Sequence, residues 1–147
     1  MDSNIFYYHL LDDKTYGPKA TAILRRIEEG EEAATSVIVI SELVSLFEYR
    51  KLQLNKSGFT EDRKKKLIEA FDAAIKGFHE LLASLPQLRK LECSWLDALK
   101  AFDYREEFRS GFNDCLNMAI MERNKITEIY SYDKAFDSVP WLNRKQE

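Results

Sequence analysis

The sequence predicts an α/β protein with a central parallel sheet and helices on both faces of that sheet. Two short stretches, one ending near residue 35 and one at 126–132, have the composition of strands. The longer stretches around them carry apolar residues at three- and four-residue spacing, which is typical of helices. Strands that alternate with helices pair in parallel, and 147 residues are enough for one domain with its own core.

The first third of the chain predicts two helices with one short strand between them. After an apolar run at 5–11 and a Gly-Pro loop, a helix is expected from Lys19 to about Glu28, ended by Gly30. Residues 33–40 include a β-branched run that a buried strand could use, yet residues 42–48 have helical spacing. We predict a short strand that ends near Thr35 and a helix to about Lys51, because Ser36 can then cap that helix.

The remainder predicts three more helices and a last strand. A capped helix of about 25 residues ends before Pro86, and another begins at Ser94. The Ser94 helix is expected to bury its large apolar residues, and the charged segment 104–111 is expected to be a loop. Asn113 is expected to cap a helix that ends near Asn124, and the strand 126–132 follows. The apolar residues expected to be buried are Trp95, Leu96, Leu99 and Phe102.

Composition excludes several classes of protein. With 22 basic and 25 acidic residues the net charge is -3, so nucleic acid would have to be held by a local basic patch or through bound cations. Cys93 and Cys115 have no cysteine or histidine at zinc-ligand spacing and are predicted to be reduced. No run approaches the roughly 18 apolar residues of a membrane span, and the opening residues are unlike a secretory signal, so we expect a cytoplasmic protein.

Acidic residues stand where ligands bind in open parallel sheets, beyond the carboxyl ends of strands. Asp133 follows the last predicted strand, and Asp114 begins a predicted helix, where the helix dipole favours an ionised carboxylate. Asn117 lies one turn later on the same face. Spacing alone does not bring these residues together with the acids of the first half.

Four blocks in the correct order resemble the acidic blocks of PIN domains. Asp2-Ser3-Asn4 with a following apolar pair resembles the family's opening, and Ser41-Glu42-Leu43 resembles its second block. The segment 112–119 around Asp114 is similar to the third block, and 129–137 is similar to the fourth, with Ser131 in place of a threonine. The resemblance spans a single domain over 1–147 but leaves the mainly helical middle, about 52–111, uncovered.

The resemblance implies a metal site and an activity. In PIN domains four acids meet at one end of a parallel sheet and hold Mg²⁺ or Mn²⁺ against an RNA phosphate, and all-oxygen ligation suits those ions. The corresponding acids here are Asp2, Glu42, Asp114 and Asp133, with Asp137 and Asn117 as auxiliary ligands. The residues expected to orient ligands or contact RNA are Ser3, Asn4, Ser131, Arg105 and Arg109.

The resemblance also implies a biological role, with alternatives left open. The expected function is a metal-dependent endoribonuclease of the VapC toxin type, which forms a homodimer and is inhibited by an antitoxin protein. A catalytically silent PIN-fold module that binds RNA or protein, or a housekeeping RNA-processing nuclease, would share the fold. Only Met1 precedes the first aspartate, where the family has a strand. Either the native start lies upstream or this strand is cut short, and we predict the former.

Overall fold

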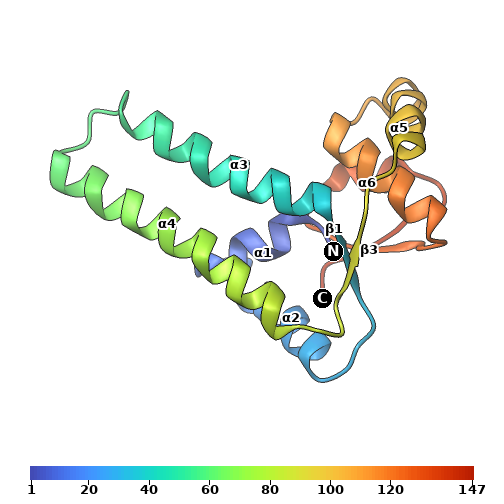
Figure 1. Ribbon diagram of the computed structural model, residues 1–147, viewed down its shortest axis with the longest axis horizontal. Helices are drawn as coiled ribbons and strands as arrows, with labels where there is room; N and C mark the ends of the chain where they lie inside the picture. The colour runs from blue at the N-terminus through green and yellow to red at the C-terminus, as the bar shows by residue number, and fades with distance from the viewer.

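The computed structural model covers residues 1–147 and has the predicted α/β class, with six α-helices and short parallel strands (Figure 1). The helices are α1 (Ser3–Leu10), α2 (Gly17–Glu28), α3 (Val37–Leu54), α4 (Glu61–Ser84), α5 (Trp95–Phe108) and α6 (Phe112–Arg123). The strands are β1 (Ala34–Ser36), β2 (Arg89–Leu91), β3 (Glu128–Tyr130) and β4 (Asn143–Lys145), with a 3₁₀ helix, η1 (Lys134–Ser138), between the last two. The α3–α4 hairpin extends to one side of the strands, and α5 and α6 lie on the other (Figure 1).

Two parallel strand pairs, β1 with β2 and β3 with β4, are joined by the first two residues of the chain. The Met1 amino group donates to the Ala34 carbonyl at 2.6 Å, and the Asp2 amide donates to the Tyr130 carbonyl at 3.0 Å. Met1 and Asp2 therefore occupy the place of a central strand between β1 and β3. Beyond Met1 the two strands line a cavity of about 320 Å³.

The junction of β1 and α3 forms as predicted. The Ser36 hydroxyl accepts a hydrogen bond from the Val39 amide, so Ser36 is the N-cap and the β-branched run after it is helical. Thr60 caps α4 in the same way through the Arg63 amide. Helix α2 begins two residues earlier than predicted, and α3 ends three residues later than predicted.

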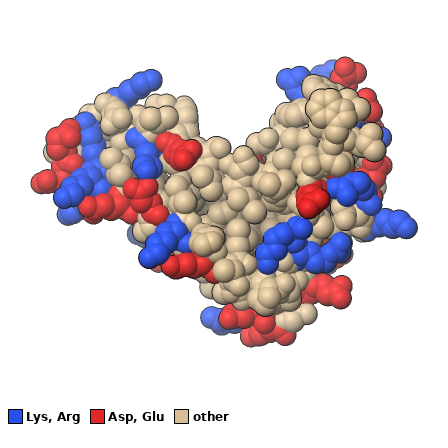
Figure 2. Space-filling view, in the orientation of Figure 1, with Lys and Arg blue, Asp and Glu red and all other residues tan.

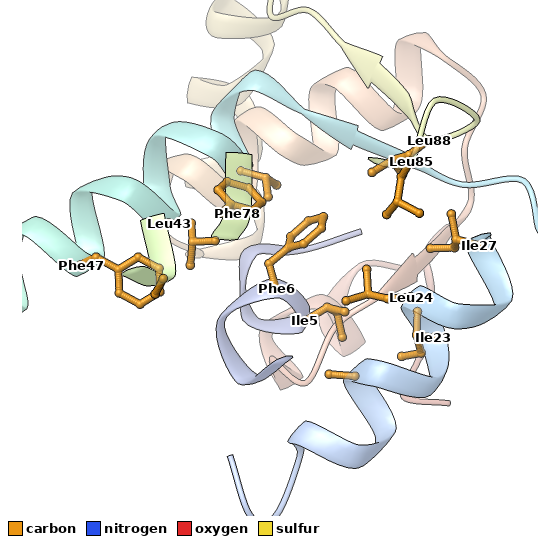
Figure 3. Packing of buried hydrophobic residues seen from close by; sticks show 13 residues of the cluster. Ile5, Phe6, Ile23, Leu24, Ile27, Leu43, Phe47, Phe78, Leu85 and Leu88 are labelled. Atoms are coloured by element: carbon orange, nitrogen blue, oxygen red, sulfur yellow. The ribbon is translucent and has the colours of Figure 1, made fainter. Parts of the chain in front are cut away.

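Two apolar clusters anchor the elements that carry the acids. The first gathers side chains of α1 to α4, with the Phe6 and Phe78 rings 5.0 Å apart between centroids (Figure 3). The second lies between α5, α6, β3 and η1 and includes the fully buried Met118 and Phe136. Burying each such side chain contributes about 2 kcal/mol. This packing fixes the first turn of α1 and the first two turns of α6.

Helix α5 corrects two predictions. The segment predicted as a loop from Tyr104 continues the helix to Phe108, and Arg109 ends it in the left-handed conformation with φ 54°. The apolar residues predicted to be buried are exposed: Trp95 77%, Leu96 71%, Leu99 49% and Phe102 58%. They lie on the helix face opposite to Asp97, Ala101 and Tyr104, which are the residues that pack against α6. The face of α5 that packs against α6 is therefore less apolar than its exposed face.

Other boundaries also differ from the predictions. Gly111, not Asn113, precedes α6, which places Asp114 third in the helix and not first. Strand β3 is shorter than predicted, so Asp133 lies three residues beyond its end, where it caps η1. Strands β2 and β4 were not predicted, because three exposed or half-buried residues with two charged side chains carry no strand pattern. Both cysteines are free, Cys115 buried and Cys93 half-buried.

None of the six helices combines the length and apolar character that crossing a membrane requires.

Candidate functional site

Asp2 is the most firmly held of the predicted acids. It is 5% exposed and is the N-cap of α1, where Oδ1 accepts from the Ser3 amide at 2.7 Å. Oδ2 accepts from Asn4 Nδ2 at 2.7 Å and from Ser131 Oγ at 2.5 Å. Burial raises the pKa of Asp2, although these hydrogen bonds oppose the rise. Residues near both ends of the chain thus hold the Asp2 carboxylate in place through hydrogen bonds.

Glu42 lies in the second turn of α3, beside the fully buried Leu43. Burial raises the pKa of Glu42, the negative charges of Asp2 and Asp133 raise it further, and the nearby Ser3 hydroxyl opposes the rise. Its Oε2 atom is buried and has no hydrogen-bond partner. A buried carboxylate oxygen without a donor is costly, so this atom is suited to a cation.

Asp114 interacts with all three of the other predicted acids. Burial, followed by the charges of Asp2, Glu42 and Asp133, raises the pKa of Asp114 to about 7. The close approach depends on Gly111, because a Cβ atom at position 111 would lie 3.1 Å from Asp114 Oδ2. The missing side chain at 111 thus leaves room for this carboxylate at the start of α6.

Asp133 completes the group from the segment between β3 and η1. Its Oδ1 accepts from the Ala135 amide at 2.8 Å, and its own amide donates to Ser131 Oγ at 2.9 Å. Its charge contributes to the raised pKa values of the other three acids. The structure thus brings together four acids in mutual electrostatic contact, which we call the acidic cluster: Asp2, Glu42, Asp114 and Asp133. Their role as metal ligands stays a prediction.

The donor chemistry of the acidic cluster fits a hard divalent cation. No Lys or Arg side chain forms an ion pair with any of its four acids. The nearby Met1 amino group is a weak counter-charge, because burial lowers its pKa to about 6. No three Asp, Glu, His or Cys side chains already stand close enough to enclose one ion. Side-chain rotation would have to bring the carboxylates closer together around a cation.

The smaller polar residues predicted for the site mostly support the acids. Ser3, Asn4 and Ser131 all hydrogen-bond to Asp2, and Asn4 Oδ1 also accepts from the Tyr132 amide at 3.2 Å. Ser131 Oγ donates to Asp2 and accepts from the Asp133 amide, so one buried hydroxyl fixes the spacing of two acids. Their contact with RNA stays a prediction.

The two auxiliary ligands are engaged elsewhere. Asn117 Oδ1 accepts from Ser36 Oγ at 2.6 Å, while its buried Nδ2 has no partner and borders the cavity between β1 and β3. Asp137 forms an ion pair through both oxygens with Arg144, at 2.6 and 2.7 Å, and this lowers the pKa of Asp137. The structure does not bring Asp137 into the acidic cluster.

Arg105 and Arg109 lie at the end of α5 and line an open hollow beside the start of α6. Two neighbours in that hollow, Phe102 and Phe112, had not been predicted as site residues. The helical pattern predicted that Phe102 is buried in the core, so no sequence signal indicated its position at the surface. Figure 2 shows a broad notch between the α3–α4 arm and the α5–α6 arm, with most charged side chains on the arms and few on the floor.

Carboxylates gathered beyond the carboxyl ends of parallel strands, as they are here beyond β1 and β3, are typical of α/β proteins that bind a divalent cation. Residues 1–142 match the family model of the PIN domain, which covers nearly the whole chain. The chain therefore belongs to the PIN domain family, whose members are generally metal-dependent nucleases. No curated protein and no solved structure matches it.

Proposed function

We propose that this PIN domain is a metal-dependent endoribonuclease and that the acidic cluster holds its Mg²⁺ or Mn²⁺. The observation that carries the proposal is the set of four electrostatically coupled carboxylates without a Lys or Arg partner, one of which has a buried orphan oxygen. Such a set is destabilising unless cations or protons neutralise it. Burial, followed by the charges of the other three acids, raises the pKa of Asp114, and metal binding would release its proton.

The residues of the site have distinct tasks in this proposal. Asp2, fixed by three side-chain or backbone donors, provides a ligand that needs no reorganisation. Glu42 supplies the orphan Oε2, and the exposed Asp133 is the ligand on the substrate side. A bound cation would polarise the phosphate and lower the pKa of an attacking water. The expected products are a 3′-hydroxyl and a 5′-phosphate, as the family resemblance implies.

RNA would approach from the α5–α6 side of the cluster. The chain has a small net negative charge, so local cations must receive the phosphates. Arg105 and Arg109 are exposed, lie beside Gly111, and form no ion pair within the chain. We propose that they contact the RNA backbone beside the cleaved bond.

The biological role that we propose is that of a VapC-type toxin in the cytoplasm, with a homodimeric chain and an antitoxin that covers the acidic cluster. The exposed apolar stripe of α5 supports a protein contact through Trp95, Leu96 and Leu99, because large apolar side chains gathered on one helix face are unfavourable in water. A housekeeping RNA-processing nuclease would use the same residues. A silent binding module is the second candidate, favoured by the spacing of the acids, which do not already enclose an ion.

Cleavage of a labelled single-stranded RNA by the purified protein tests the proposal. We expect cleavage with Mn²⁺ or Mg²⁺, none with EDTA, and loss of cleavage in Asp114→Asn. Asp103→Asn is the matched control, because Asp103 is exposed on α5 and forms no hydrogen bond or ion pair. Absence of cleavage by folded, metal-supplied protein on a pool of RNAs would favour the silent module.

A further inference from the structure

An open hollow of about 600 Å³ lies at the turn between α5 and α6. Its volume is in the range of small-molecule binding sites. It combines an aromatic wall, a basic wall and the backbone of the turn, and we call it the aromatic–basic hollow. Its lining residues are Phe102, Arg105, Arg109, Ser110, Gly111 and Phe112.

The aromatic wall presents a free ring face to solvent. Phe102 is 58% exposed, and its ring packs on the half-buried Phe112 with 4.9 Å between centroids. The contact with Phe112 leaves Phe102 largely exposed. Aromatic faces of this kind bind unstacked nucleobases, each worth about 1–3 kcal/mol and with little sequence preference.

The basic wall carries two cations that have no anionic partner within the chain. No ion pair or side-chain hydrogen bond involves Arg105 or Arg109. Glu106 borders the same region, so two guanidinium groups oppose one carboxylate. The remaining positive charge favours an anion such as a phosphodiester.

The hollow shares a wall with the acidic cluster. Gly111 lines the hollow, and a Cβ atom added to it would lie 3.1 Å from Asp114 Oδ2. The hollow therefore adjoins the acidic cluster, through Gly111, at the α5–α6 turn. Double-stranded RNA offers no free base face there, because its bases are stacked and paired.

We propose that the aromatic–basic hollow binds one nucleotide of single-stranded RNA next to the cleaved phosphate, with its base on Phe102 and its phosphate on Arg105 and Arg109. This inference rests on the proposed nuclease function and names the form of its substrate. It makes the hollow a positioning subsite, which selects unpaired RNA and leaves the chemistry to the acidic cluster.

Kinetics on two substrates test the inference. One is a short single-stranded RNA, and the other is methyl p-nitrophenyl phosphate, a diester with no nucleobase and no neighbouring phosphate. Phe102→Ala and Arg109→Ala are each expected to raise KM for the RNA about tenfold, with kcat and hydrolysis of the small diester nearly unchanged. Phe102→Trp is expected to restore the RNA KM.

Leu99→Ala is the matched control, since Leu99 lies on the same exposed stripe but does not line the hollow. Unchanged RNA kinetics in both Phe102→Ala and Arg109→Ala would overturn the inference. It would also be overturned if Leu99→Ala and Phe102→Ala raised KM equally and both changed the sedimentation of the protein, because Phe102 would then belong to the protein contact of α5 and not to an RNA subsite.

Failure of the nuclease proposal has a different outcome. In that case the wild-type protein hydrolyses neither substrate with any metal, and binding of fluorescent single-stranded RNA becomes the readout for the hollow. Weaker binding by Phe102→Ala than by Leu99→Ala would then support the hollow alone, and equal binding would refute it.

Discussion

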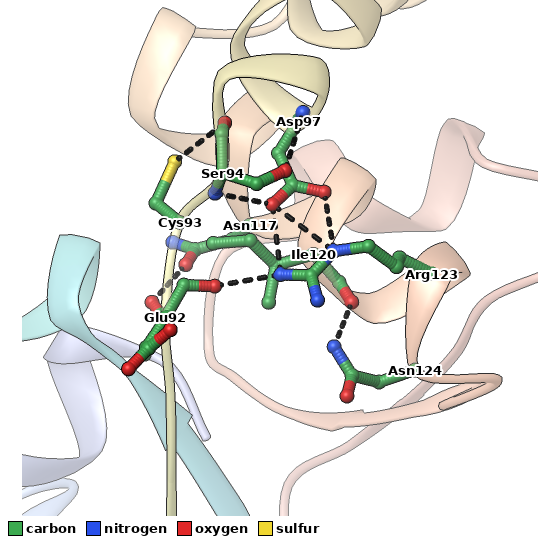
Figure 4. A network of polar contacts seen from close by, with 9 residues as sticks. Glu92, Cys93, Ser94, Asp97, Asn117, Ile120, Arg123 and Asn124 are labelled. Atoms are coloured by element: carbon green, nitrogen blue, oxygen red, sulfur yellow. Dashed lines mark hydrogen bonds and ion pairs between the residues drawn. The ribbon is translucent and has the colours of Figure 1, made fainter.

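Asp97 and the acidic cluster are two places where this protein buries carboxylates, and it treats them in opposite ways. Asp97 is 3% exposed, and Arg123 Nε and Nη2 donate to its two oxygens at 2.8 Å each (Figure 4). It also closes a capping box with Ser94 at the start of α5. Burial alone would raise the pKa of Asp97, but the hydrogen bonds from Arg123 and Ser94 hold it below its usual value.

The acidic cluster has the reverse electrostatics, and its burial ranges from the buried Asp2 through the half-buried Glu42 and Asp114 to the exposed Asp133. Its acids face one another, and the pKa of Asp114 rises to about 7. A buried acid with an arginine partner joins two helices, as Asp97 and Arg123 join α5 to α6. Buried acids without one store repulsion, which a bound cation would relieve. The difference separates a structural acid from a candidate functional one without knowledge of the reaction.

The largest effect expected is on activity. Glu42→Gln keeps the size of the side chain but removes the charge of the orphan oxygen, and we expect RNA cleavage to fall by at least about a thousandfold, equivalent to ~4 kcal/mol. Asp97→Asn should keep cleavage within a few-fold when assayed below its melting temperature. Rate measurements at saturating Mn²⁺ decide between them. A similar loss of activity in the two variants would contradict the distinction between Asp97 and the acidic cluster.

For the free energy of unfolding, in contrast to activity, we expect Asp97 to matter more than the acidic cluster. Asp97→Ala leaves Arg123 without its partner and opens the capping box, so we expect the free energy of unfolding to fall by about 3 kcal/mol. Because the pKa of Asp97 is lowered in the folded state, this contribution is present above its unfolded value near 3.8 and is lost as the pH falls through the folded value. Urea unfolding at pH 7 and at pH 2.5 measures both statements. An unchanged difference at the two pH values would contradict the assignment to this ion pair.

The sequence predicted local features, such as helix caps, better than it predicted which face of a helix is buried. Ser36 was placed correctly as the cap of α3, because a cap is made by residues three apart. The prediction that Trp95 and Leu99 are buried was wrong. The face of α5 that packs inward is the one that carries Asp97, and its contact with Arg123 joins residues 26 apart in sequence. Strands β2 and β4 were missed because backbone pairing alone defines them.

The acidic cluster shows the same limit. Its four residues were named from family blocks, and their assembly depends on contacts such as Ser131 with Asp2, which span the chain. No local pattern could show that Asp137 would bind Arg144 or that Asn117 would bind Ser36. The hollow beside Asp114 was equally invisible, since the pattern that predicted a buried Phe102 gave the wrong face of the helix.

The smallest expected effect is on the stability of the metal-free protein when Asp114 of the acidic cluster is replaced. The folded-state pKa of Asp114, about 7, lies above the unfolded value of 3.8, so the folded protein binds more protons between these values and loses stability as the pH rises through them. Asp114→Asn should therefore stabilise the metal-free protein at pH 8 by ~2 kcal/mol, roughly half of what about 1.4 kcal/mol per pKa unit implies, because solvent screens part of the charge.

Thermal and urea unfolding in EDTA at pH 4 and pH 8 check this expectation. The gain should be absent at pH 4, where the folded wild-type carboxyl at position 114 is protonated. Saturating Mn²⁺ should raise the stability of the wild-type protein more than that of Asp114→Asn, because a cation relieves the same repulsion that the substitution removes. A loss of stability in Asp114→Asn at pH 8 would show that Asp114 is a structural acid like Asp97, and the distinction between the two regions would fail.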